Sequence, residues 1–133
     1  MSRIRHIALS VPDPEKTADF YVKTFGLRRV GKTESVLASG VYLSDGYINL
    51  ALLRYHNDEV AGVSGGKDFV GVHHFGFQVE SAEAAKGSVE SNGGSFFMDL
   101  PALKDTLYYE EKYRDPDGII FDVSQNGWAT KPE

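Results

Sequence analysis

His-Ile-Ala-Leu-Ser-Val at residues 6–11 has a counterpart in His-Phe-Gly-Phe-Gln-Val at residues 74–79. In both stretches the side chains alternate in kind, as they do along a strand whose two faces meet different surroundings. His6 lies on the small and polar row of the first stretch, and His74 lies on the matching row of the second. The repeat therefore predicts two similar strands, each with a histidine on the face that avoids the apolar core.

Each predicted strand opens a longer repeated pattern. Asp13 and Pro14 suit the cap and first position of a helix that ends at Gly26, and Ser81 suits the cap of a second helix that runs to about Glu90. Further strands are predicted at 27–30, 36–43 and 47–53, and again at 95–98, 106–113 and 119–124. The pattern predicts an α+β fold made of two βαβββ modules, at about 4–53 and 72–125.

The two modules share one predicted domain, 1–133. A polar, glycine-rich stretch at 54–71 separates them and is interpreted as a linker or mobile loop. The tail at 126–133 has only weak patterning. A chain of 133 residues suits one domain of two small modules with a common core.

Composition excludes several classes of function. The net charge of −5 disfavours a nucleic-acid partner, which would require a basic surface. No apolar run approaches the roughly 20 residues of a spanning helix, so no membrane segment is expected. The first residues lead directly into a strand and do not resemble a signal peptide, which predicts a cytoplasmic protein. The remaining expectation is a small-molecule substrate.

A third candidate ligand comes from the last predicted strand, where Asp122 lies on the face opposite the apolar row of Phe121 and Val123. If the sheets curve so that these faces look inward, two imidazoles and one carboxylate converge in a cavity. The residues expected to line it are Ala8, Ser10, Gly76, Gln78 and Ser124. The chain has no cysteine, so any metal ligands must be histidine, carboxylate, amide or water.

Two histidines and one carboxylate form a ligand set with catalytic potential. Such a set leaves coordination positions open for water, substrate or dioxygen, as metal catalysis requires. We therefore predict that His6, His74 and Asp122 bind a divalent metal. His73 has the opposite parity and is expected to be structural, whereas His56 lies in the loop and is expected to be solvated.

Several motifs resemble those of one superfamily. They are His-Ile-Ala-Leu-Ser-Val-Pro-Asp at 6–13, Phe20-Tyr21, Phe25-Gly26-Leu27, His74-Phe75-Gly76-Phe77, and Asp115-Pro116-Asp117-Gly118 ahead of Asp122. Across about residues 4–125 the chain resembles the vicinal oxygen chelate superfamily. This superfamily includes glyoxalase I, extradiol dioxygenases, fosfomycin-resistance enzymes, methylmalonyl-CoA epimerase and bleomycin-binding proteins.

The resemblance implies that the two modules form a partly open barrel around a divalent metal, which would be Fe, Zn, Ni, Mn or Co. It also implies substrates that chelate the metal through neighbouring oxygens, and a homodimer. Asn49 and Ala51 lie on the strand that supplies a fourth ligand in enzymes like glyoxalase I, and we expect them to complete the lining of the cavity.

Departures from the superfamily pattern narrow the choice of reaction. The usual last metal ligand in the superfamily is Glu, and Asp122 is one methylene shorter. Ala51 cannot supply the fourth ligand that enzymes like glyoxalase I have on this strand. Ala8 stands where one group of fosfomycin-resistance enzymes has Thr, which disfavours that activity. Extradiol dioxygenases use iron on three ligands, but their signature has a histidine before the Asp-Pro turn, and no histidine follows His74 here.

Three hypotheses follow. The first is a lyase or isomerase in which the metal, as a Lewis acid, polarises vicinal oxygens and stabilises an enolate or related anion, with Glu110 or metal-bound hydroxide as the candidate base. The second is an Fe(II) ring-cleaving dioxygenase with the same ligands. The third is a metal-free protein that sequesters a metabolite or antibiotic. Tyr108 and Tyr109 are expected to pack against the sheet.

Overall fold

The computed structural model describes residues 1–104, 106 and 109–132 of the chain. The chain forms two compact units. The first unit consists of Met1–His6 and His74–Trp128, and the second unit consists of Ile7–His73 and Ala129–Glu133. Strand β1 (Arg3–Ser10) and strand β5 (Gly71–Gln78) each contribute residues to both units.

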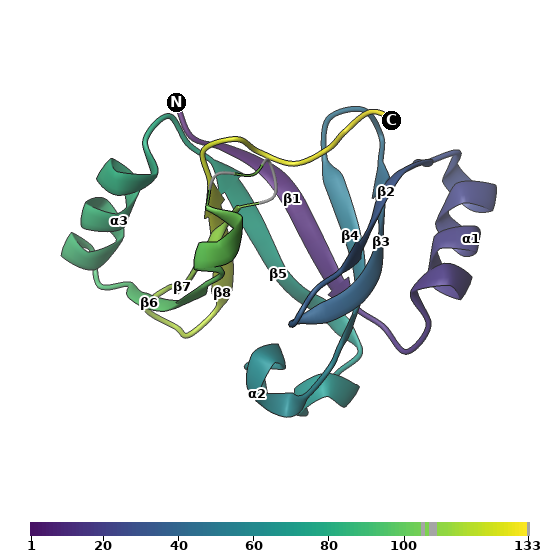
Figure 1. The fold of residues 1–133 in the computed structure, drawn as a ribbon, viewed down its shortest axis with the longest axis horizontal. Helices are drawn as coiled ribbons and strands as arrows, with labels where there is room; N and C mark the ends of the chain where they lie inside the picture. The colour runs from purple at the N-terminus through teal and green to yellow at the C-terminus, as the bar shows by residue number, and fades with distance from the viewer. Residues whose placement is uncertain (105, 107–108, 133) are drawn as a thin grey trace. The chain divides into compact units, whose positions relative to one another are not determined.

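The order of elements along the chain contains the expected βαβββ pattern twice (Figure 1). After β1 come α1 (Pro14–Phe25), β2 (Arg28–Glu34), β3 (Ala38–Ser44) and β4 (Asn49–Tyr55). After β5 come α3 (Ala82–Ser91), β6 (Ser95–Asp99), β7 (Glu111–Arg114) and β8 (Ile120–Ser124). The stretch between the two series holds a short helix, α2 (Asp58–Ala61), and a 3₁₀ turn, η1 (Gly66–Asp68), and a second 3₁₀ turn, η2 (Pro101–Leu103), follows β6.

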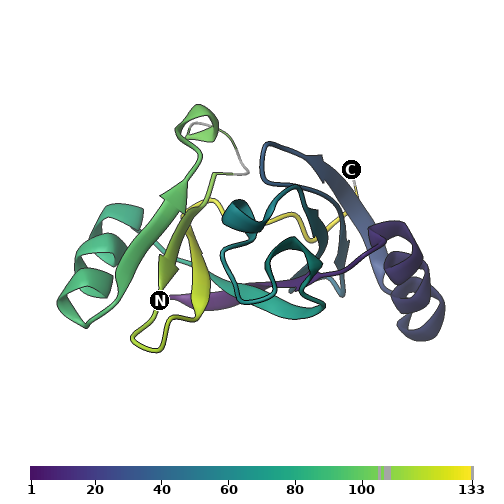
Figure 2. The ribbon, with the colours of Figure 1, turned by 90° about the horizontal axis from the view of Figure 1, so that it is seen from below.

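In the second unit the strands have the order β2-β3-β4-β1, and α1 packs against β2, β3 and β4 (Figures 1 and 2). Asp13 caps α1 by accepting a hydrogen bond from the backbone N–H of Lys16 at 3.2 Å, as its position before Pro14 predicts. The helix ends at Gly26, whose φ of 72° suits glycine. The helix core residue is Ala18, which is fully buried against Leu43 and Leu52.

Two expectations for α1 and β2 were wrong. The helical spacing of Ala18, Tyr21, Val22 and Phe25 predicts an apolar stripe that packs on the sheet. Phe25 is nevertheless 69% exposed, on the last turn of α1 beside the Tyr21 ring. The strand expected at 27–30 extends to Glu34, since its polar second half pairs with β3 from Gly31–Tyr42 to Glu34–Ser39. An edge strand can carry such polar residues because its outer side is open to water.

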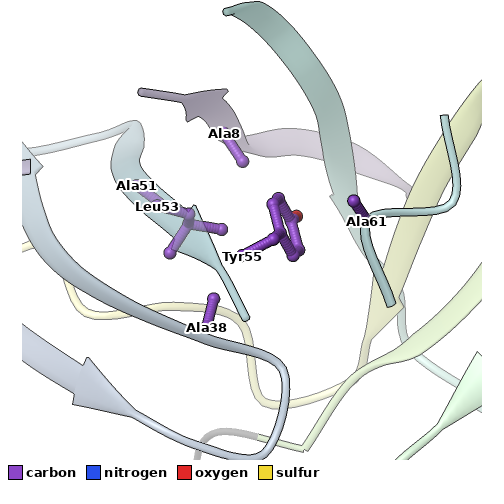
Figure 3. Close-up of a cluster of buried hydrophobic side chains, with 6 residues drawn as sticks. All are labelled: Ala8, Ala38, Ala51, Leu53, Tyr55 and Ala61. Atoms are coloured by element: carbon purple, nitrogen blue, oxygen red, sulfur yellow. The ribbon is translucent and has the colours of Figure 1, made fainter. Parts of the chain in front are cut away.

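A second apolar cluster surrounds Tyr55 in the same unit (Figure 3). Its members are Ala8, Ala38, Ala51, Leu53, Tyr55 and Ala61. Small alanine side chains leave room for one phenol ring, and the Tyr55 ring lies between Ala61 and Leu53 (Figure 3). Ala8 and Ser10 on β1 are buried, whereas Ile7 and Leu9 on the opposite row are only partly buried. The expectation that the His6 row avoids the apolar core is therefore wrong at Ala8, which packs in this cluster.

In the first unit the strands have the order β1-β5-β8-β7-β6. Helix α3 begins at its Ser81 cap, as expected, and packs against β6 and β8 (Figures 1 and 2). The core beneath it is formed by Tyr113, Val79 and Val123. The strand order ends at β2 and β6 without closing on itself, which agrees with the open character expected of the fold. Strand β7 begins at Glu111, not at 106, and residues 107 and 108 of the expected strand lie outside the described residues.

The register of the first unit sets up one row of residues across the sheet. Asp122 on β8 lies directly opposite Lys112 on antiparallel β7 and beside Gly76 on parallel β5. Residues that lie opposite one another on neighbouring strands share a face of the sheet. The row therefore places a lysine, a carboxylate and a residue with no side chain on one face.

None of the described helices combines the length and apolarity that a membrane span requires.

Candidate metal centre

The side chains of His6, His74 and Asp122 converge within the first unit, from β1, β5 and β8 respectively. One donor atom from each lies within 4.8 Å of the others, and all three residues are buried. The two Nε2 atoms are 3.3 Å apart, and Asp122 Oδ2 is 2.9 Å from His74 Nε2 and 3.7 Å from His6 Nε2. The three predicted ligands are thus brought together by strands that start far apart in sequence.

The two oxygens of Asp122 have different surroundings. Oδ1 accepts a hydrogen bond from Lys112 Nζ at 2.9 Å. Oδ2 is close to His74, but the contact lacks hydrogen-bond geometry, and Oδ2 has no hydrogen-bond partner among the described residues. A buried carboxylate oxygen without a partner is costly unless something else satisfies it. A divalent cation between this oxygen and the two imidazole nitrogens would do so, and the donor set therefore fits a metal.

Charges next to the ligands shift the pKa of two carboxyl groups. Burial alone would raise the pKa of Asp122, but the positive charge of Lys112, followed by side-chain hydrogen bonding with Glu110 and the electrostatic effect of His6, outweighs burial and holds that pKa below its usual value. Burial and then the negative charge of Asp122 raise the pKa of Glu110, and Lys112 only partly opposes this. The site thus contains one carboxylate that is held ionised and one that takes up a proton more readily.

Lys112 is a site residue that sequence analysis missed. It is buried, with Nζ 2.9 Å from Asp122 Oδ1 and 3.8 Å from Glu110 Oε1. A buried lysine is rare unless it is paired. The signal in the sequence is its parity: Lys112 shares a strand row with Arg114, opposite the apolar Tyr113, but only the register with β8 shows that it meets Asp122.

Trp128 is the second residue that sequence analysis missed, because it lies in the weakly patterned tail. Its indole stacks on the His6 imidazole, and its Nε1–H donates a hydrogen bond to Glu110 Oε2 at 2.9 Å. Gly76 provides the space: a Cβ there would lie 2.7 Å from an indole carbon. Trp128 therefore connects a predicted ligand, His6, to the predicted base, Glu110.

The residues expected to line a cavity fall in both units. In the first unit, Gly76 lies under Trp128, Gln78 accepts a hydrogen bond from Arg5, and the Ser124 hydroxyl donates one to the carbonyl oxygen of Tyr109. The members in the second unit are Ala8, Ser10, Asn49 and Ala51, all of which are buried. Asn49 donates a hydrogen bond to the carbonyl oxygen of Ala129. Their role towards a substrate stays a prediction.

The other two histidines, His56 and His73, have partners within the second unit. His73 Nε2 lies 2.6 Å from the Ala61 carbonyl oxygen, and its Nδ1 lies 3.1 Å from the Tyr55 hydroxyl. A carbonyl oxygen only accepts, so Nε2 carries the proton, and in the neutral ring Nδ1 accepts from Tyr55. His56, partly exposed, contacts the Ser35 carbonyl oxygen and Glu34.

Of the two tyrosines expected to pack against the sheet, one can be placed. The Tyr109 hydroxyl donates a hydrogen bond to Asp99 Oδ2 at 3.0 Å, and burial followed by this bond raises the pKa of Tyr109 to about 12. Tyr108 lies outside the described residues.

A family model described as the Glyoxalase/Bleomycin resistance protein/Dioxygenase superfamily matches residues 3–123. Among solved structures, a variant of the Streptomyces coelicolor methylmalonyl-CoA epimerase in complex with 2-nitronate-propionyl-CoA has 24% sequence identity and a TM-score of 0.73, over 91% of this chain and 94% of that one. A methylmalonyl-CoA epimerase in complex with methylmalonyl-CoA and NH4+ has 21% identity and a TM-score of 0.74, over 92% and 93% of the two chains.

A hypothetical protein from Bacillus halodurans C-125 is similar to the same degree, with 20% identity and a TM-score of 0.72 over 92% of both chains. At these identities the similarity is one of fold. No curated protein matches the chain.

Proposed function

Because the chain belongs to the Glyoxalase/Bleomycin resistance protein/Dioxygenase superfamily, we propose that it is a divalent-metal-dependent enzyme acting on a small, oxygen-rich molecule. The metal ligands in this proposal are His6, His74 and Asp122. The observation that carries it is the buried Asp122 Oδ2, which faces two imidazole nitrogens and has no hydrogen-bond partner among the described residues.

The first candidate reaction is that of a lyase or isomerase. A dication bound to these ligands would act as a Lewis acid on vicinal oxygens of the substrate. Glu110 is the proposed base, because its raised pKa makes its carboxylate a better proton acceptor than an ordinary glutamate. Trp128 holds Glu110 Oε2 through the indole N–H, and Oε1 lies 3.8 Å from Lys112 Nζ. Structures of the same fold include methylmalonyl-CoA epimerases, so an isomerase assay is the first to run.

The decisive experiment is elemental analysis of protein purified without chelators, for wild type, His74→Ala and His56→Ala. We expect about one divalent metal per chain in wild type, loss of the metal in His74→Ala, and retention in His56→Ala, because His56 contacts Ser35 and Glu34 and lies outside the ligand cluster. Zinc, nickel, manganese or cobalt would support lyase or isomerase chemistry. Absence of metal, with no uptake of added divalent ions, would contradict the proposal and favour a metal-free binding protein.

The second candidate is an Fe(II) ring-cleaving dioxygenase, favoured by the ligand types themselves. Two histidines and one carboxylate with open positions are typical of non-haem Fe(II) oxygenases. This candidate predicts stoichiometric iron and oxygen consumption with a catecholic substrate. Iron-loaded protein that consumes no oxygen with a panel of catechols would exclude it.

We propose that the protein acts as a cytoplasmic homodimer on a small-molecule substrate. Light scattering on purified protein would test the dimer, since a monomer gives half the mass.

A further inference from the structure

The Lys112–Asp122 ion pair is enclosed within the candidate site. The two residues lie directly opposite one another on β7 and β8, and the side chains are 9% and 0% exposed. Their atoms Nζ and Oδ1 are 2.9 Å apart. A buried pair is screened little by water or salt, so the lysine charge acts on everything bound nearby.

The ion pair gives the two oxygens of the Asp122 carboxylate different roles. Lys112 occupies Oδ1, and Oδ2 is the oxygen that lies 2.9 Å from His74 Nε2 and 3.7 Å from His6 Nε2. As long as Lys112 holds Oδ1, Asp122 offers a cation one oxygen and not two. This leaves more of the coordination sphere for other ligands.

The pair also sets the charge of the site. With neutral imidazoles, the negative charge of Asp122 is offset by Lys112, so the three ligands and the lysine together carry no net charge. A dication bound there would keep most of its positive charge. The second nearby carboxyl group, that of Glu110, lies farther from the lysine, with Oε1 3.8 Å from Lys112 Nζ.

We propose that Lys112 is a positioning and specificity residue that keeps Asp122 a one-oxygen ligand and makes the metal-loaded site select anionic oxygen ligands over neutral ones. The inference rests on the proposed function, because it requires a bound metal. The expected substrate is then a small carboxylate or similar oxyanion that carries a second oxygen beside the charged group.

Two probes differ in charge and little else. Glycolate and glycolamide each offer two neighbouring oxygens, but only glycolate is an anion. Calorimetry would measure the Kd of Co²⁺ for the purified protein, and then the Kd of each probe for the Co²⁺-loaded protein. The quantity of interest is the ratio of the two probe affinities, since the intrinsic preference of Co²⁺ for glycolate is common to all variants.

The variants are Lys112→Met, which removes the charge, Lys112→Arg, which retains it, and Lys86→Met as the matched control. Lys86 is an exposed lysine on α3 of the same unit. We expect the preference for glycolate to fall about tenfold or more in Lys112→Met, because a unit charge within a few ångströms of a poorly screened site has at least this effect. Lys112→Arg and Lys86→Met should keep the preference, and Lys112→Met should bind Co²⁺ at least as tightly as wild type.

An unchanged ratio in folded Lys112→Met would overturn the inference, as would loss of Co²⁺ binding in that variant. If Lys112→Met does not fold, wild type alone decides: its preference for glycolate must exceed that of aqueous Co²⁺, and an equal or smaller preference would overturn the inference. If wild type binds no Co²⁺, the proposed function fails, and this inference fails with it. If Co²⁺ binds and only the ratio is unaffected, the proposed function stands without it.

Discussion

The Trp128 indole lies flat against the His6 imidazole, with ring centroids 4.7 Å apart and planes 6° from parallel. The same indole donates its N–H to Glu110 Oε2. One side chain from the tail thus restrains two groups that the proposed reaction needs, the ring of a metal ligand and the carboxyl group of the base. Stacking and a hydrogen bond together fix the plane of the indole, and so also the orientation of His6.

Gly76→Ala should displace Trp128. A Cβ at Gly76 would lie 2.7 Å and 2.8 Å from two indole carbons, closer than packed atoms tolerate, and in a tight contact of 3.1 Å with the His6 Cβ. We expect a loss of about 2 kcal/mol in the free energy of unfolding, as is typical of overpacking. Urea denaturation would measure it. Gly87→Ala is the control: an added Cβ inside α3 meets no atom within 4 Å, and the variant should be as stable as wild type or more stable.

Fluorescence of Trp128 should report metal binding directly. Trp128 is the only tryptophan in the chain, and it stacks on a proposed ligand. Co²⁺ should quench the emission with an endpoint of about one ion per chain, since a paramagnetic ion bound to His6 would lie close to the indole. The His74→Ala variant should show no saturable quenching, whereas His56→Ala should behave as wild type. Quenching that stays equal in wild type and His74→Ala would contradict the assigned ligands.

Asp122→Asn should destabilise the metal-free protein as well as abolish metal binding. The substitution leaves the buried Lys112 without its 2.9 Å counter-charge. Breaking one side of a buried ion pair costs about 3 kcal/mol or more. The comparison is Asp68→Asn, which breaks exposed pairs with Arg54 and Lys67 and should cost less than about 1 kcal/mol. Equal losses in the two variants, measured by urea denaturation with a chelator present, would show that the Lys112 pair is not specially important.

The raised pKa of Glu110 should make the free energy of unfolding depend on pH. Its folded pKa is raised above 4.5, so the folded state binds the proton more tightly than the unfolded state. The resulting stabilisation is fully present below the unfolded pKa and is lost as the pH rises through the folded pKa. Relative to Glu110→Gln, which cannot ionise, wild type should therefore lose stability as the pH rises above 4.5 in the presence of a chelator. A constant difference between the two proteins across that range would contradict the shift.

Tyr55→Phe should lower stability without affecting the metal site. The Tyr55 hydroxyl donates to His73 Nδ1 in the second unit, and the three proposed ligands belong to the first unit. Loss of one buried hydrogen bond costs about 1 kcal/mol. Denaturation and elemental analysis on the same sample would check both statements. A variant that unfolds as wild type does but loses its metal would reverse this assignment of His73 as structural.

Local pattern was enough to predict the main elements of this fold. Asp13, Gly26 and Ser81 mark helix ends because caps satisfy backbone groups within a few residues of the chain. Alternation along single strands was likewise enough to predict that His6, His74 and Asp122 lie on strand faces that can converge. The same local reasoning failed at Phe25, because helical spacing does not show where the partner surface stops, and at β2, whose polar end is a strand only through its pairing with β3.

The sequence by itself determined the element types, the helix limits and the chemical nature of the three candidate ligands, since each depends on neighbours along the chain. Only the tertiary structure decided what surrounds those ligands. The register between β7 and β8 brings Lys112 to Asp122, and the return of the tail brings Trp128 to His6. Neither contact has a signature in local periodicity, because strand register and tail docking depend on packing between segments far apart in the sequence.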